Sequence, residues 1–247
     1  MTKPDAPAEN EGQGGDIQVI ARVAALLDQL DPDSPSLDTP TTALVLGVGR
    51  STAHRYLASL ERAGLLQRRD ATNYELGPAL RRLGTLALAR LGVVEAAGPV
   101  MRELSAQVRN SVVLSVWGGR APVIARVVPD SSRITTISVE VGRSLPPDAA
   151  QSRVFAAYQK PGRRGMRAVD DEHVRLVGDL LTARYVYPGS GFKTLAAPVL
   201  DGEGGIVAAL AVIGLTVFMP DDQDDAVTEA LVAAAARIVP PPEAADA

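Results

Sequence analysis

LGVGRSTAHRYLASLERAGLLQRRDATNYEL, residues 46–76, predicts a turn, a helix and a hairpin in that order. The two glycines at the start are typical of a helix that ends in a left-handed cap just before the next helix begins. From Arg50 the apolar residues recur with helical spacing as far as Gly64, where we expect the helix to end. Residues 65–69 then have strand character, and the polar residues 70–73 separate them from a second short strand at residues 74–76.

The outward face of this helix is short, hydroxylic and positively charged. Ser51, Arg55, Ala58 and Arg62 lie opposite the apolar face, with Thr52 and His54 on its flanks. A helix of this kind followed by a basic hairpin is the layout of a winged helix-turn-helix, in which the helix enters the major groove and the wing contacts the adjacent backbone. The alternative is a solvated amphipathic helix beside an ordinary surface hairpin, and amphipathicity alone does not separate the two. The order of turn, helix and basic hairpin favours DNA binding.

Length and composition indicate two globular domains. The chain has 247 residues, of which 46% are hydrophobic and 22% charged, as in soluble globular proteins. It has no apolar run long enough to cross a bilayer, and residues 1–16 lack the features of a signal peptide, so we expect a cytoplasmic protein that does not contact membranes. With no cysteine and two histidines, we expect no disulfide, no metal site and no cofactor.

Positive charge is concentrated in one part of this acidic chain, whose net charge is −4. Residues 50–90 hold eight arginines against three acidic residues, whereas residues 1–49 hold two basic against eight acidic residues. Residues 91–247 hold 15 basic against 18 acidic residues. The local excess, and not the overall sign, is what attracts phosphate.

The residues before the turn predict a tail and two helices. Residues 1–16 are too polar to pack, so we expect disorder there. Residues 17–30 predict a core helix with one apolar face, made of Ile20, Val23, Ala24, Leu27 and Leu30. A second, short helix runs to Leu46, capped by Asp38 and with Pro40 in its first turn.

The N-terminal region resembles the DNA-binding domain of the IclR family of bacterial transcription regulators. The resemblance is carried by Gly47, the Ser51-Thr52 pair, Arg55, the leucines 57 and 60, Gly64, and the exit Tyr74-x-Leu76-Gly77. It implies that Ser51, Thr52 and Arg55 contact DNA and that Arg68 and Arg69 act from the wing. The DNA-binding residues that we predict are Arg50, Ser51, Thr52, His54, Arg55, Arg68 and Arg69.

Residues 78–92 predict a helix with Pro78 at its first position and an apolar stripe of leucines. The stripe fits a helix packed within one domain. The family resemblance instead implies a linker helix that helps to pair two subunits.

From Val93 onward the pattern changes to that of a mixed helix and sheet domain. We expect helices at residues 94–108 and 170–185, a short helix within 142–159 and a final helix at 222–239; Ala226, Leu231, Ala234 and Ile238 would form the inward face of the last one. We expect strands at residues 111–117, 122–128, 134–141, 193–200 and 206–214, and a basic turn at 161–165. The fold class is therefore α+β, with an antiparallel sheet covered on one side.

This second part is similar to the GAF-like effector-binding domain of the same family. The motifs are VGRSLP at 141–146, GFKTLAAPV at 191–199 and AALAVIG at 208–214. The resemblance implies domains at 17–77, 78–92 (linker) and 93–239 (effector binding and oligomerisation), with a tail at 240–247. It implies an effector pocket lined by Leu145, Gln151, Ser152, Thr194, Ala211 and Ile213. Apolar walls with few polar groups favour a small organic effector, and Arg143 or Arg153 could bind a carboxylate.

Other classes of function are weaker. A catalytic triad needs a histidine, but His54 lies on the expected DNA-reading helix and His173 in a charged segment, so we predict no catalytic residues. The acidic residues at 221–225 could bind a cation, but they fit better at the N-terminus of the last helix, where the helix dipole favours negative charge. We therefore predict a transcription regulator, homodimeric or tetrameric, that binds a double-stranded operator and a small organic effector, either aromatic or a carboxylate. The remaining alternative is a regulator whose C-terminal domain only dimerises.

Overall fold

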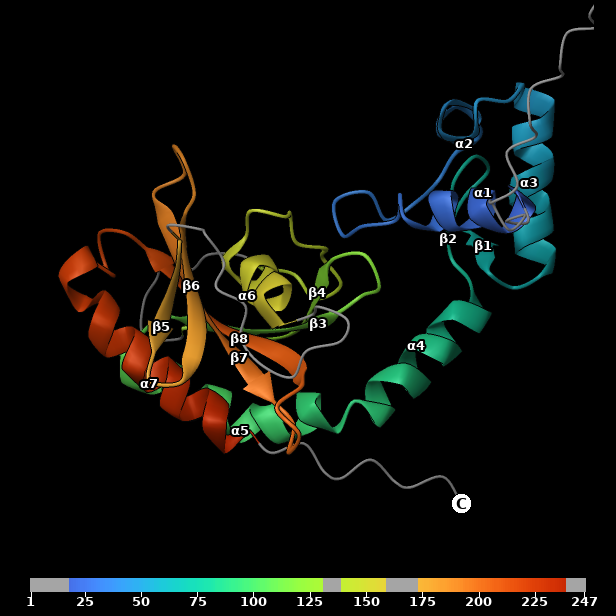
Figure 1. The fold of residues 1–247 in the computed structure, drawn as a ribbon. Coiled ribbons are helices and arrows are strands. Elements are labelled where there is room, and N and C mark those ends of the chain that lie inside the picture. The colour runs from blue at the N-terminus through green and yellow to red at the C-terminus, as the bar shows by residue number, and fades with distance from the viewer. Residues whose placement is uncertain (1–17, 131–138, 159–172, 239–247) are drawn as a thin grey trace, which may run out of the picture. The chain divides into compact units, whose positions relative to one another are not determined.

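The computed structural model describes residues 18–130, 139–158 and 173–238 of the chain (Figure 1). The predicted disorder of residues 1–16 and the predicted turn at 161–165 lie outside these ranges. Contacts divide the chain into two compact units, Met1–Arg82 and Leu83–Ala247.

Between residues 18 and 77, the first unit has three helices and a two-stranded antiparallel hairpin. Its elements are α1 (Gln18–Leu27), α2 (Thr39–Leu46), α3 (Arg50–Arg62), β1 (Leu66–Arg68) and β2 (Tyr74–Leu76). The cap at Asp38 is confirmed, because its carboxylate accepts a hydrogen bond of 2.8 Å from the Thr41 amide. Gly47 adopts the left-handed conformation with φ of 62°, which lets the chain leave α2 and enter α3 after two further residues.

A small apolar core holds this unit together. Its buried members come from all parts of the unit: Leu26, Leu37, Leu57, Leu60, Leu66 and Tyr74. Leu37 extends the hairpin, because its amide and carbonyl both bond to Tyr74, at 2.7 and 2.8 Å. The inward face that we predicted for α1 is partly wrong. Ile20 is 62% exposed, and Leu26 is the fully buried residue of that helix.

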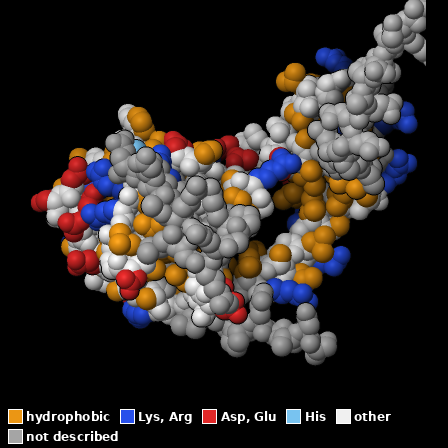
Figure 2. All heavy atoms as spheres, in the orientation of Figure 1, with side chains coloured by type: hydrophobic (Ala, Val, Ile, Leu, Met, Phe, Trp, Pro, Cys, Tyr) orange, Lys and Arg blue, Asp and Glu red, His pale blue; other side chains and the backbone are white. Residues whose placement is uncertain are grey.

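Helix α4 (Pro78–Arg90) follows the hairpin and contains no buried side chain. The division between the two units falls within it, after Arg82. Figure 2 shows hydrophobic side chains along this helix. The leucines of α4 are therefore not part of the buried core of either unit.

The second unit is a six-stranded antiparallel sheet with the order β4-β3-β8-β7-β6-β5. Its strands are β3 (Ser111–Trp117), β4 (Pro122–Val128), β5 (Val174–Val177), β6 (Leu180–Val186), β7 (Phe192–Leu200) and β8 (Ile206–Leu215). Its helices are α5 (Gly92–Val108), α6 (Ala150–Tyr158) and α7 (Asp224–Arg237), the last preceded by the 3-10 turn η1 (Asp221–Gln223).

Helices cover both faces of this sheet, so the prediction that only one side is covered was wrong. Helices α5 and α7 pack on one face, against residues such as Leu195 of β7 and Leu210 of β8. Helix α6 packs on the other face, against Ala196 and Ala211. Because successive strand residues point to opposite faces, the nearly continuous apolar runs of β7 and β8 fit a sheet buried on both sides.

Two predicted elements of this unit are not found. Residues 174–185 form the β5–β6 hairpin instead of a helix, with Gly178 in the left-handed conformation (φ 58°) at the turn. Val174 and Val177 favour strand, and glycine at a positive φ is typical of a two-residue hairpin turn. The strand predicted at 134–141 lies mostly outside the described residues, and residues 139–141 are not strand.

The remaining helices are close to the predicted ones. Leu231 and Ala234 of α7 and Ile238 directly after it are buried as expected, but Ala226 is exposed and Val227 is buried in its place. No single helix in the described ranges is long and apolar enough to cross a membrane; α4 and α5 pass that test only as a pair, bent by 67°.

Candidate nucleic-acid interface and effector site

Helix α3 presents the predicted polar face to solvent. Ala53, Leu57 and Leu60 are buried, so the helix is fixed in its rotation by its apolar side. On the other side, Arg50, Ser51, His54 and Arg55 are exposed and Thr52 is half-buried. None of these four exposed side chains has a hydrogen-bond or ion-pair partner among the described residues. Figure 2 shows the blue side chains of basic residues over this part of the molecule.

The N-terminus of α3 adds backbone donors to this face. Gly49 is the cap residue and provides no side-chain hydrogen bond, so the first amides of the helix are not bonded by a side-chain cap. Amides at a helix N-terminus, together with the helix dipole, favour an anion such as a phosphate group. The arrangement can therefore bind a phosphate beside a short row of guanidinium, imidazole and hydroxyl groups.

The tip of the hairpin is a rigid turn organised by Asp70. Its carboxylate accepts hydrogen bonds from the amides of Thr72 (2.8 Å) and Asn73 (2.9 Å) and from the Asn73 side chain. These bonds, the one from the Thr72 amide first, lower the pKa of Asp70 to about 2. The carboxylate is therefore ionised at neutral pH, where it accepts these bonds.

The two wing arginines have different surroundings. Arg68 pairs with Glu61 of α3 at 3.3 Å and lies over the Tyr74 ring at 5.0 Å, so it ties the wing to the helix. Arg69 is exposed, and its side chain has no partner among the described residues. Of the two, Arg69 is the better placed to contact a phosphate.

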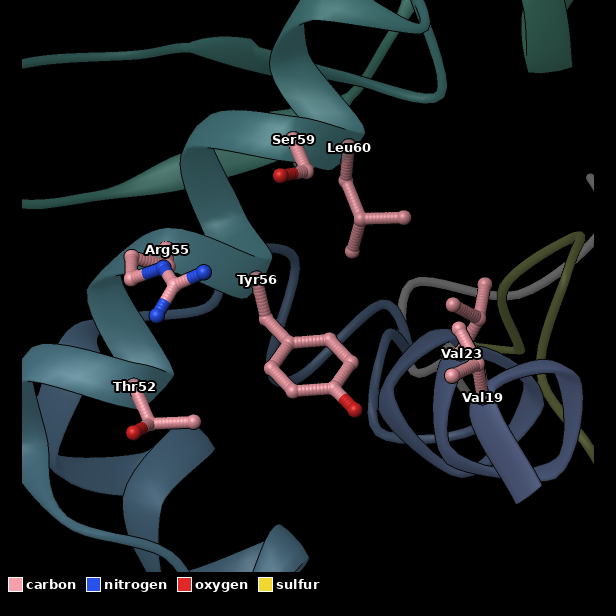
Figure 3. A pocket seen from close by; sticks show the side chains of 7 residues that line it. All are labelled: Val19, Val23, Thr52, Arg55, Tyr56, Ser59 and Leu60. Atoms are coloured by element: carbon pink, nitrogen blue, oxygen red, sulfur yellow. The ribbon is translucent and has the colours of Figure 1, made fainter.

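A groove of about 370 Å³ lies between α1 and α3 (Figure 3). Val19 and Val23 line it from α1, and Tyr56 and Leu60 from α3. The Tyr56 ring points into the space between the helices, and Arg22 donates a 3.3 Å hydrogen bond to its hydroxyl. The groove reaches Thr52 and Arg55, so it borders the polar face of α3.

The structure places the six predicted effector residues on one side of the second unit. Thr194, Ala211 and Ile213 lie on the sheet face that α6 covers, and Thr194 and Ile213 are paired across β7 and β8. Gln151 and Ser152 lie in α6, and Leu145 lies in the loop before it. All six are buried. Among the described residues, Gln151 Oε1 has no hydrogen-bond partner, nor does Ser115 Oγ of β3.

The two arginines considered for carboxylate binding both have partners. Arg143 pairs with Glu140 at 3.3 Å. Arg153 donates a 2.9 Å hydrogen bond to the Asp148 carbonyl and lies 5.8 Å from the centre of the Tyr185 ring. Neither is an unpaired charge in the buried layer between α6 and the sheet.

The acidic residues at 221–225 bind cationic side chains of the sheet. Lys193 of β7 is fully buried and contacts Asp221 at 2.8 Å and Asp224 at 2.5 Å. Arg184 of β6 contacts the same two carboxylates, at 2.6 and 2.7 Å. The hydrogen bond from Lys193, more than any other contact, holds the pKa of Asp221 below its usual value.

This network orders the start of α7, and it was not predicted from the sequence. The signal was the recurrence of basic residues on one face of β5, β6 and β7, namely Arg175, Arg184 and Lys193. It was hidden because residues 170–185 were interpreted as a helix.

Comparison with known proteins agrees with this geometry. Residues 19–70 match the model of the IclR helix-turn-helix domain. The transcriptional regulator Rv1719 of Mycobacterium tuberculosis is 35% identical over 178 residues, which are 71% of this chain and 67% of the relative. TtgV of Pseudomonas putida, also an HTH-type transcriptional regulator, is 32% identical over 60% of this chain and 57% of its own length.

Solved structures show the same fold. An IclR family regulator from Brucella abortus superposes with a TM-score of 0.69 at 20% identity, over 90% of this chain and 91% of its own. An IclR homologue from Microbacterium hydrocarbonoxydans in complex with 4-hydroxybenzoate gives 0.65 at 19% identity, over 89% and 97%.

The family-model match covers the helix-turn-helix and the start of the wing, where the structure exposes the basic face of α3. The match to Rv1719 extends well beyond that region. This chain therefore belongs to the IclR family of DNA-binding transcriptional regulators.

Proposed function

We propose that this regulator binds an operator through α3 and the wing. The observation that carries the proposal is the set of exposed side chains on α3 that have no partner among the described residues and lie opposite three buried apolar residues. An exposed helix with arginine and hydroxyl groups fits the major groove, where arginine can bond guanine and serine or threonine can bond either base type. We assign this role to residues 17–77 and expect the protein to act in the cytoplasm as a regulator, not as an enzyme.

Each element of the surface has its own part in this proposal. Arg55 and Ser51 point outward from the middle of the exposed face and read base edges. Arg50, Thr52, His54 and the N-terminal amides of α3 hold the flanking phosphates. Arg69 contacts the backbone from the wing. Arg68 supports the wing through Glu61 and Tyr74, and reaches DNA only when it gives up the pair with Glu61.

Binding of a duplex selected by the protein from random-sequence DNA tests this proposal. We expect Arg55→Ala to weaken binding by about 1–3 kcal/mol, because a base contact is lost, and to relax the preference for one base. Arg102→Ala is the matched control, since Arg102 is an exposed arginine on α5 of the other unit. Equal affinities of the wild type and Arg55→Ala in a mobility-shift assay would remove Arg55 from the interface.

We propose further that the protein is a homodimer paired through α4, residues 78–92 being the linker. Leu83, Leu86 and Leu88 are each nearly half exposed on a helix without any buried side chain. Apolar side chains gathered on one exposed helix mark a protein interface, and a two-fold axis lets the same surface serve both subunits. A dimer would present two copies of α3 to a palindromic operator.

We propose that the layer between α6 and the sheet, within residues 93–239, takes a small organic effector. The supporting observation is the unpaired Gln151 Oε1 among buried apolar residues, because a buried polar atom without a partner costs stability that a ligand can restore. The homologue from Microbacterium hydrocarbonoxydans, which has the same fold, is complexed with 4-hydroxybenzoate. A small aromatic acid is therefore the class of effector to test first.

Thermal unfolding with 4-hydroxybenzoate and related acids tests the effector proposal. A ligand that binds only the folded protein raises the unfolding temperature. We expect Gln151→Leu to remove this shift and Leu176→Ala, on the exposed strand β5, to keep it. A protein whose unfolding temperature and DNA affinity respond to none of these acids would support the alternative of a domain that only dimerises.

A further inference from the structure

Arg81 joins the second turn of α4 to the outer face of the wing. Its Nη2 donates a hydrogen bond of 2.7 Å to Gln67 Oε1, and its Nη1 donates one of 3.2 Å to the Leu76 carbonyl. Gln67 Nε2 in turn donates to Glu75 Oε1 at 2.5 Å. One guanidinium thus holds both strands of the hairpin.

The wing is held from its two faces by different arginines. Gln67 and Glu75 are paired across the hairpin and lie on the face opposite the buried Leu66 and Tyr74. Arg81 contacts that outer face. On the inner face, Arg68 contacts Glu61 and the Tyr74 ring. The angle of the wing relative to α3 therefore depends on Arg81 as well as on Arg68.

The start of α4 is itself fixed, so it can serve as the support for the wing. The Gly77 amide donates to the Leu65 carbonyl at 2.8 Å, and the Ala79 amide donates to the Gly64 carbonyl at 3.0 Å. The approach at Gly77 is so close that a Cβ there would lie 2.3 Å from the Gly64 oxygen. Arg81 therefore extends from a helix that is attached to the end of α3.

We propose that Arg81 is a positioning residue of the DNA interface: it sets the wing so that Arg69 reaches the phosphate backbone, and it does not contact DNA itself. This inference rests on the proposed operator binding by α3 and the wing. Because α4 continues as one helix to Arg90, past the division between the units, a rotation or bend of α4 reaches the wing through Arg81.

A double-mutant cycle on a duplex selected by the protein tests the proposal. We expect Arg81→Ala to weaken binding by at least about tenfold, as the loss of hydrogen bonds to a charged group does. In the Arg81→Ala background, Arg69→Ala and Gln67→Ala should cause little further loss, because the wing is already misplaced. Arg82→Ala is the matched control: Arg82 is the next residue, exposed and without a partner among the described residues. Its effect and that of Arg69→Ala should be independent.

Additive effects of Arg81→Ala and Arg69→Ala would overturn the proposal if each change also lowered the slope of log affinity against log salt concentration by about 0.9. Arg81 would then be a direct phosphate contact. An Arg81→Ala protein with wild-type affinity would overturn it as well. Amide hydrogen exchange gives a second test without DNA. Exchange at the Arg69 amide, which bonds to the Asn73 carbonyl at 2.9 Å, should be severalfold faster in Arg81→Ala than in Arg82→Ala. Equal exchange rates in the two variants would contradict the proposal even if the protein selected no duplex.

Discussion

At the scale of single residues, the interface depends on which charged side chains are already engaged by the protein. Arg68 and Arg69 are neighbours in the sequence, yet Arg68 pairs with Glu61 whereas Arg69 is exposed without a partner among the described residues. A phosphate must compete with Glu61 for Arg68, but it meets no such competitor at Arg69. The same reasoning separates Arg81, which is engaged by Gln67, from Arg82.

The sequence could identify the exposed face of α3 but not these pairings. Helical spacing fixed which side of α3 is buried, because Ala53, Leu57 and Leu60 recur every three to four residues. The partner of Arg68 lies seven residues away in the chain, and that of Arg81 lies 14 residues away. Contacts across a turn or between elements depend on packing that a linear pattern does not contain.

Asp70 gives a pH-dependent prediction at the same scale. Its pKa in the folded wing is about 2, against 3.8 for an ordinary aspartate. The lowered value means that the carboxylate stabilises the turn fully above pH 3.8 and loses this effect as the pH falls toward 2. We expect Asn73→Ala, which removes one of the donors, to raise the midpoint measured by NMR at the Asp70 carboxyl. A midpoint unchanged by this substitution would show that the turn is not held as described.

At the scale of elements, the sheet of the second unit contains an ion network with a buried centre, Lys193 and Asp224, where helix α7 begins. Lys193 is fully buried between Asp221 and Asp224, and Arg184 contacts the same carboxylates. This network also explains why the acidic run precedes α7, a position that the helix dipole favours in addition.

Substitutions in the network should be costly in proportion to the charge that they leave buried. We expect Asp224→Ala to destabilise the second unit by about 3–5 kcal/mol, because Lys193 loses its buried partner. The double variant Lys193→Met/Asp224→Leu should recover part of this loss, since no buried charge is left unpaired. Arg237→Ala, whose pair with Glu103 is exposed, should change the free energy of unfolding by at most about 1 kcal/mol. If urea unfolding showed a larger loss in the free energy of unfolding for Arg237→Ala than for Asp224→Ala, this description would be contradicted.

The type of element was predicted wrongly where a short apolar segment fits both the helical and the strand period. Helix α5 and strands β3 and β4 were predicted closely, since each is long and bounded by clear turns. Residues 174–185 contain apolar residues at spacings that fit a helix as well as a hairpin, and Gly178 with Asp179 was not recognised as a turn. The effector residues were predicted by family resemblance, and the structure groups them on one face, but whether they bind a ligand stays a prediction.

At the scale of the whole molecule, α4 decides how two copies would meet. We expect the double variant Leu83→Glu/Leu86→Glu to sediment as a monomer where the wild type sediments as a dimer, because charges replace apolar side chains in the proposed interface. Both leucines are nearly half exposed in the single chain, so the substitutions should leave its fold intact. Leu44→Glu, at the most exposed leucine of α2, is the control and should stay dimeric. A double variant that remains dimeric would place the interface elsewhere.

Photocrosslinking can establish whether the exposed face of α3 contacts the operator. The photoreactive residue p-benzoylphenylalanine would replace His54, which is exposed at the edge of that face, or Val217, which is exposed on the second unit. On a duplex selected by the wild-type protein, we expect a crosslink from position 54 and none from position 217. A protein that binds the duplex but crosslinks to it only from position 217 would contradict operator binding through α3.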